Sequence, residues 1–186
     1  MRPILVFEDI RSPNQTHLLT LGGVKVKATR YAWLSVPNWI AFGLLIALLG
    51  SKGESYSAII WTGILYGLCL SLSNVIHSLG HIVAGRMAHS PMDVLLLTAT
   101  RDVTLYLQDH TSCPGGTRLL RSLGGPLFNL LAGAVVLGLM MFFKAAWIHI
   151  FVAVNLGVGV WTLCPVPTMD GWVIWGTLLR SRSRGN

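Results

Sequence analysis

Charged residues are scarce in this sequence. Only 11% of its 186 residues are Asp, Glu, Lys or Arg, against about 25% in soluble domains, and 53% are hydrophobic. This composition excludes an ordinary soluble globular domain and predicts an integral membrane protein in contact with the lipid bilayer. The net charge of +7 does not indicate nucleic-acid binding, because the basic residues lie in loops and tails between apolar runs.

The sequence also has little cysteine and no stretch typical of a targeting signal. Its three cysteines (Cys69, Cys113 and Cys164) are an odd number without zinc-finger spacing, so no disulfide framework is predicted. Residues 1–31 contain no apolar core of the kind found in secretory signal peptides, so we expect none there. No internal repeat divides the chain, which favours a single domain.

Apolar runs dominate the rest of the sequence and predict the fold class. Four of them, at residues 36–50, 57–87, 119–143 and 145–163, predict about four transmembrane helices. A fifth piece, residues 172–179, is too short to cross a bilayer and predicts a half-helix. We therefore expect an all-α integral membrane protein.

Two polar segments carry strand-like patterns. Residues 24–28 alternate between apolar and polar side chains, and residues 103–107 have a similar strand-like composition. We expect a small strand or hairpin element at the N-terminus and in the 88–117 loop. The expected organisation of the single membrane domain, 1–186, is a cytoplasmic N-terminal segment with a short strand (1–33), a helical core (34–180) and a basic tail (181–186).

The basic residues alternate between rich and poor loops. From the N-terminus, the successive polar segments hold Arg2, Arg11, Lys25, Lys27 and Arg30; then Lys52; then Arg86, Arg101, Arg118 and Arg121; then Lys144; then Arg180, Arg182 and Arg184. The positive-inside rule then predicts a multi-pass protein with both termini in the cytoplasm. In this topology His77 and His81 lie near the cytoplasmic end of the second span, and Asp170 follows the fourth span at a similar depth, so the three can meet.

These three residues form a possible metal site. His77 and His81 are four residues apart and project from the same helical face, so both imidazoles can reach one zinc ion at about 2.0–2.1 Å. Asp170 can complete the set from another part of the chain. Two other readings remain open: the histidines can be a packing pair between helices, and Asp170 can be the N-cap of a helix that begins at Gly171.

Three motifs, in order, resemble those of the site-2 proteases, which are zinc intramembrane metalloproteases. Residues 77–86 read HSLGHIVAGR and are similar to the H-E-x-G-H helix of that family. Residues 125–131 read GPLFNLL and resemble its G-P-L-x-N segment. Asn155, followed by PVPTMDG at residues 165–171, is similar to its last ligand motif. The resemblance covers about residues 20–180.

The resemblance implies a core of membrane helices around a zinc ion and assigns roles to several residues. His77, His81 and Asp170 would be the zinc ligands. The loop at 98–110 would be a hairpin that holds a substrate strand beside the zinc. The residues expected to contact a substrate or partner are Asn129, Asn155, Thr162 and Pro165.

Two departures from the family pattern concern catalysis. Ser78 stands where the family has its catalytic glutamate, and Thr162 stands where it has a second asparagine. The glutamate of H-E-x-x-H zinc peptidases acts as general base, and general acid–base catalysis contributes typically about 10²–10⁴-fold in rate. A serine hydroxyl does not ionise near neutral pH and cannot take that role. We therefore expect little or no protease activity.

Three hypotheses of function follow. The favoured one is a catalytically inactive site-2-protease homologue, or pseudoprotease, that acts as a binding or structural subunit with a transmembrane partner or a larger membrane complex. The glycine pair Gly63 and Gly67 suits such a partner helix, or equally packing within the chain. The second is an active zinc intramembrane endopeptidase whose base is another acid, with Asp93, Asp102 and Asp109 as candidates that no spacing requires. The third is a small transporter or channel subunit that uses the His/Asp cluster.

Overall fold

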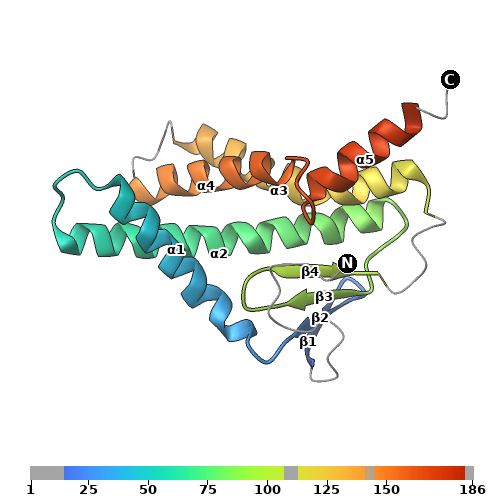
Figure 1. The fold of residues 1–186 in the computed structure, drawn as a ribbon, viewed down its shortest axis with the longest axis horizontal. Coiled ribbons are helices and arrows are strands. Elements are labelled where there is room, and N and C mark those ends of the chain that lie inside the picture. The colour runs from blue at the N-terminus through green and yellow to red at the C-terminus, as the bar shows by residue number, and fades with distance from the viewer. Residues whose placement is uncertain (1–14, 107–112, 141, 143–144, 183–186) are drawn as a thin grey trace.

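A computed structural model describes residues 15–106, 113–140, 142 and 145–182 (Figure 1). The predictions for residues 107 and 109, for the N-terminal residues 1–14 and for residues 183–186 of the tail lie outside the described part. The described helices are a 3₁₀ turn at Ala32–Leu34, α1 (Ser35–Gly50), α2 (Tyr56–Met87), α3 (Gly115–Leu139), α4 (Ala146–Thr162) and α5 (Asp170–Arg182).

Helix α2 is the axis of the helical layer, and α1, α3 and α4 pack along it, whereas α5 packs on α3 (Figure 1). It begins after Ser55, whose side chain accepts a hydrogen bond from the backbone N–H of Ala58 and so caps the helix. Helix α1 packs closely on α2, because Gly63 and Gly67 lie directly against the backbone of α1. In the structure this glycine pair therefore serves packing within the chain.

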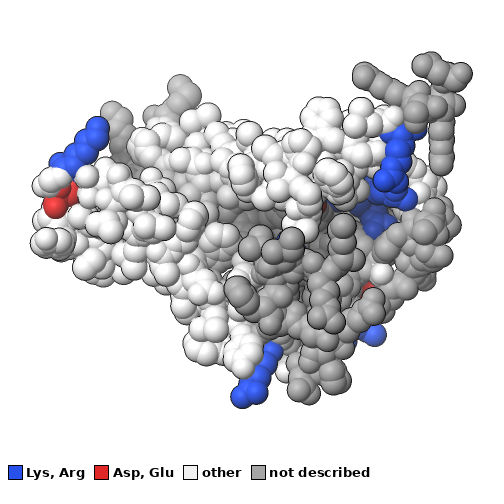
Figure 2. Space-filling view, viewed as in Figure 1, with Lys and Arg blue, Asp and Glu red and all other residues white. Residues whose placement is uncertain are grey.

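Three of the helices are long and apolar enough to cross a membrane. They are Ala32–Gly50, which includes the 3₁₀ turn, Tyr56–Met87 and Gly115–Leu139. Helix α4 is apolar but has 17 residues, at the lower limit of what spans a bilayer. On the visible face, charged side chains lie at the two ends and beside the sheet (Figure 2). The protein is thus a membrane protein by its helices, whereas the four-span topology with cytoplasmic termini stays a prediction.

The strands predicted near the N-terminus and in the 88–117 loop are present, and together they form one four-stranded sheet. Its order is β1 (Thr16–Leu21), β2 (Val24–Ala28), β3 (Val94–Leu97) and β4 (Asp102–Leu105). Strands β1 and β2 form a hairpin whose turn, Gly22-Gly23, has φ of 57° and 84°, values that favour glycine. Strands β2 and β3 are parallel, and β3 and β4 are antiparallel. In this order β1 and β4 are the two edge strands of the sheet.

The inner face of the sheet packs against the C-terminal part of α2. Val24, Met92 and Leu95 are buried together with Ile82 of α2. This packing brings β4 alongside the helix that carries the two histidines (Figure 1).

Helix α3 begins four residues earlier than the apolar run that predicted it. Arg118, which precedes that run, therefore lies in the first turn of α3, and Arg121, which was counted with the loop charges, lies in the next turn. Arg121 is buried, and its guanidinium lies 3.3 Å from the centre of the Tyr106 ring. This stacking contact explains how a cation is tolerated beside the apolar helices.

Candidate metal centre

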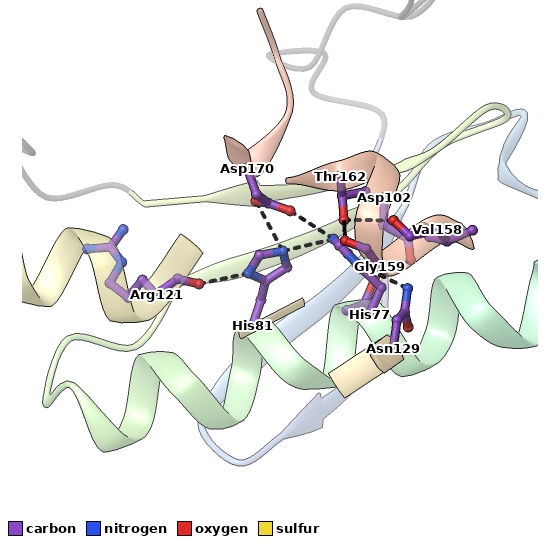
Figure 3. A network of polar contacts seen from close by, with 10 residues as sticks. His77, His81, Asp102, Arg121, Asn129, Val158, Gly159, Thr162 and Asp170 are labelled. Atoms are coloured by element: carbon purple, nitrogen blue, oxygen red, sulfur yellow. Dashed lines mark hydrogen bonds and ion pairs between the residues drawn. The ribbon is translucent and has the colours of Figure 1, made fainter. Parts of the chain in front are cut away.

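His77, His81 and Asp170 meet at one point, between α2 and the first residue of α5 (Figure 3). The Nε2 atom of His77 lies 3.0 Å from Oδ2 of Asp170, and Nε2 of His81 lies 3.3 Å from Oδ1. The two Nε2 atoms are 3.1 Å apart. Ligands about 2.0–2.1 Å from a tetrahedral zinc ion are about 3.3 Å from one another, so these separations suit one ion.

The beginning of α5 is held close to the end of α4, and this contact places Asp170. Gly171 lies directly against the backbone carbonyls of Leu163 and Cys164, where a side chain would not fit. The indole N–H of Trp175 donates to the carbonyl of Leu163 at 3.0 Å. Both oxygens of the Asp170 carboxylate therefore lie against the histidine nitrogens.

Gly125 of α3 forms the back wall of the centre. A Cβ atom at this position would lie 2.5 Å from Nε2 of His77 and 2.5 Å from Nε2 of His81. Helix α3 comes this near because Gly80 of α2 and Gly124 of α3 touch backbone to backbone at the crossing. The site thus keeps an open space where a side chain would fill it. In the sequence, Gly125 belongs to the GPLFNLL motif, which assigns it no role of its own.

The outer nitrogens of the two imidazoles have partners that fix the rings. The Nδ1–H of His81 donates to the backbone carbonyl of Arg121 at 2.9 Å. Nδ1 of His77 lies 3.4 Å from the side-chain amide of Asn129, whose Oδ1 is buried without a partner. A half-turn of this amide, which exchanges its nitrogen and oxygen, brings Oδ1 to accept the Nδ1–H of His77. Both Nε2 atoms are then free for a metal.

Two carboxylates near the centre have opposite pKa shifts. Burial opposes ionisation of Asp170, but hydrogen bonds from His77 and His81 outweigh it and lower the pKa of the Asp170 carboxyl to about 2. Burial raises the pKa of the Asp102 carboxyl, although hydrogen bonds from Ser78 and Asn74 favour its ionised form. A lowered pKa keeps the Asp170 carboxyl deprotonated near neutral pH, the form in which a carboxylate binds a metal.

Ser78 lies between the two histidines in sequence and contacts Asp102 of β4. Its hydroxyl donates to Oδ2 of Asp102 at 2.7 Å, and the side chain of Asn74, one turn earlier on α2, also hydrogen-bonds to this carboxylate. In Figure 3, dashed lines join the histidine pair to Asp170, whereas the printed side-chain contact of Asp102 is with Ser78, the residue after His77. Among Asp93, Asp102 and Asp109, the sequence offered no reason to select Asp102.

The remaining predicted site residues lie in and after α4, and their described hydrogen bonds do not reach the histidines. The buried amide of Asn155 donates to the carbonyl of Phe151 at 3.0 Å. The Thr162 hydroxyl donates to the carbonyl of Val158 at 2.9 Å. Pro165 is exposed. Their expected contact with a substrate or partner stays a prediction.

A cavity of about 360 Å³ opens beside the centre. Its lining includes His81, Asp170, Thr104, Tyr106, Arg121 and Trp172. A molecule in this cavity would thus lie between β4 and α5, next to two of the three candidate metal ligands.

The residues present fit a zinc ion. The donor set is two imidazoles and one carboxylate, the spacing suits a tetrahedral ion, and Gly125 leaves the space open. Three protein ligands leave a fourth position for water or substrate, and zinc in such a site lowers the pKa of bound water to about 7 and polarises a carbonyl group.

Comparison with solved structures finds the same architecture in a membrane protease. The site-2 protease from Methanocaldococcus jannaschii aligns with a TM-score of 0.61 and 19% identity, over 90% of this chain and 72% of that one. No protein-family model matches the sequence, and no curated protein matches it either. The chain therefore has a membrane-metalloprotease-like fold.

Proposed function

We propose that this protein binds zinc at His77, His81 and Asp170 and holds an extended segment of a transmembrane partner beside that zinc. The observation that carries the proposal is the convergence of two Nε2 atoms and one carboxylate, 3.0 to 3.3 Å apart, on a space that Gly125 keeps open. The likeness to the fold of a site-2 protease supports the same role.

The partner segment would pair with the free edge of strand β4. This strand is at the edge of the sheet, and an extended peptide can add to such an edge through main-chain hydrogen bonds. Thr104 of β4 and Trp172 of α5 both line the cavity beside the metal centre. A segment paired with β4 would therefore pass within reach of the zinc, whether it belongs to a free substrate or to a fixed subunit of a membrane complex.

The residue that bears on cleavage is Ser78, which stands where the family has its glutamate. From the sequence alone, a serine in place of the glutamate favours a protein that holds its partner without cutting it, as a pseudoprotease subunit of a membrane complex. The transporter reading gains no support from the described residues, since the His/Asp cluster is accounted for by metal binding.

Metal removal tests the proposed function. The full chain in detergent or lipid is expected to hold one zinc ion, and stripping it with a chelator is expected to lower its Tm. Zinc at about 1,000 times its Kd would stabilise the folded state by about 4 kcal/mol. The measurements are metal content by mass spectrometry and thermal unfolding with and without zinc. A folded chain that takes up no zinc would overturn the proposal.

A further inference from the structure

The Asp102 carboxylate is hydrogen-bonded to Ser78, the residue at the position where an H-E-x-x-H peptidase has its catalytic glutamate. That glutamate follows the first histidine directly, and in this chain Ser78 does. The structure brings a carboxylate to the same residue from another element, because Oδ2 of Asp102 accepts a hydrogen bond from the Ser78 hydroxyl at 2.7 Å. The carboxylate missing from the helix is thus supplied by the neighbouring strand.

The lengths of the two arrangements are comparable. In a glutamate, the carboxylate oxygens are two bonds beyond Cγ, which is about 2.4 Å. In this chain the Ser78 Oγ occupies the place of Cγ, and the Asp102 oxygen lies 2.7 Å from it. Serine and aspartate together therefore span nearly the distance that one glutamate side chain would span.

Asp102 belongs to the same strand as Thr104, which lines the cavity. Side chains alternate along a strand, so Asp102, Thr104 and Tyr106 share one face. Thr104 and Tyr106 line the cavity together with His81 and Asp170. The stacking of Tyr106 on Arg121 holds this face of the hairpin against α3.

The other acids of the described chain are less well placed. Four acidic residues are described, and of these Asp170 is already a metal-binding residue. Glu54 is exposed in the segment before α2, at the opposite end of that helix from the histidines. Asp93 precedes β3, and its backbone N–H and carbonyl bond within the sheet. Asp102 is the one whose carboxylate is bonded to the histidine-bearing turn.

We propose that Asp102 is the general base of a peptide hydrolysis at this centre, and that Ser78 positions it. The inference rests on the proposed function, because it needs zinc and a held segment. Asp102 takes a proton from water as the water oxygen bonds to the carbonyl carbon of the segment. It then delivers that proton to the amide nitrogen as the C–N bond breaks, which leaves a carboxylic acid and an amine. The Ser78 hydroxyl is unchanged.

The test uses the full zinc-loaded chain in lipid vesicles with a labelled transmembrane peptide. Asp102→Asn is expected to lower kcat by about 10²–10⁴-fold, the usual contribution of a general base, with zinc affinity unchanged. Ser78→Glu combined with Asp102→Asn returns the carboxylate to the helix and is expected to restore cleavage. Glu54→Gln is the matched carboxylate-to-amide control and is expected to cleave normally.

A second readout does not depend on turnover. A peptide hydroxamate binds zinc and gives its proton to a neighbouring carboxylate. Asp102→Asn is therefore expected to weaken its binding by about 10- to 100-fold, the loss of one hydrogen bond to a charged group. The double variant is expected to recover this affinity.

The outcomes separate the two proposals. A chain that binds no zinc overturns the proposed function itself. A zinc-loaded chain that does not cleave, but gains cleavage with Ser78→Glu alone, overturns only the role of Asp102 and leaves a protein that holds its partner. Full cleavage by Asp102→Asn also overturns the role of Asp102. If Ser78→Ala then loses cleavage while Asp102→Asn keeps it, Ser78 is the nucleophile.

Discussion

Replacing Gly125 by alanine is expected to abolish zinc binding while the helices stay folded. The added methyl carbon would lie 2.5 Å from the Nε2 atoms of both histidines, in the space where the metal would be. Moving helix α3 back would cost the close backbone packing of Gly80 against Gly124 at the helix crossing. The imidazoles must therefore turn away. Metal content, measured beside the circular dichroism spectrum, tests this.

Gly138 offers a matched control in the same helix. A Cβ atom there would meet nothing within 4 Å, so Gly138→Ala is expected to keep zinc. It would also add up to about 1 kcal/mol of stability, because alanine is the better helix former. If Gly125→Ala keeps one zinc ion with unchanged affinity, the three residues do not share a metal at the point where they meet.

The helices of this chain could be predicted from sequence because their signal is local. Each apolar run is its own evidence for a helix, and the run at 57–87 matches α2 (Tyr56–Met87) to within one residue. The meeting of His77 with Asp170 could also be foreseen, since loop charges placed the two at a similar depth. Two spans whose directions are predicted from these charges leave few ways for their ends to be arranged.

The sheet could not be predicted as one unit because its central pairing is not local. Strands β2 and β3 run parallel, and α1 and α2 lie between them in the sequence. Strand β1 gave no alternating pattern, since all six of its residues are exposed. Strand β3 is a short run of four apolar residues within a polar segment. Such a run is too short to identify by periodicity.

The contact between Ser78 and Asp102 could not be predicted from the sequence for the same reason. Asp102 belongs to β4. The position of β4 depends on its pairing with β3, and the position of β3 depends on its pairing with β2. Three acids of the segment were therefore equal candidates in the sequence. Only the register that pairs Leu97 with Asp102 distinguishes one of them. The missing glutamate was visible in the sequence, but its replacement was not.

Asn129→Leu is expected to weaken zinc binding by about 10- to 100-fold, the usual effect of removing a partner of a ligating histidine. Asn129 is fully buried, and its amide lies 3.4 Å from Nδ1 of His77. Leucine has a similar shape but accepts no hydrogen bond, so the Nδ1–H of His77 would be left unpaired. The ring would then lose the contact that directs Nε2 toward the metal. Zinc affinity measured by competition with a chelating dye gives the size of the effect.

Two further variants separate hydrogen bonding from packing at this position. Asn129→Asp keeps an oxygen that accepts the Nδ1–H of His77 and is expected to bind zinc at least as tightly as the parent, since carboxylates are common partners of zinc-bound histidine. Asn155→Leu removes an equally buried amide that bonds only within α4, and is expected to leave zinc affinity unchanged. Equal losses in Asn129→Leu and Asn155→Leu would mean that buried amides support the helices here and do not orient the ligand. A loss in Asn129→Leu that Asn129→Asp recovers requires that His77 present Nε2 to the metal.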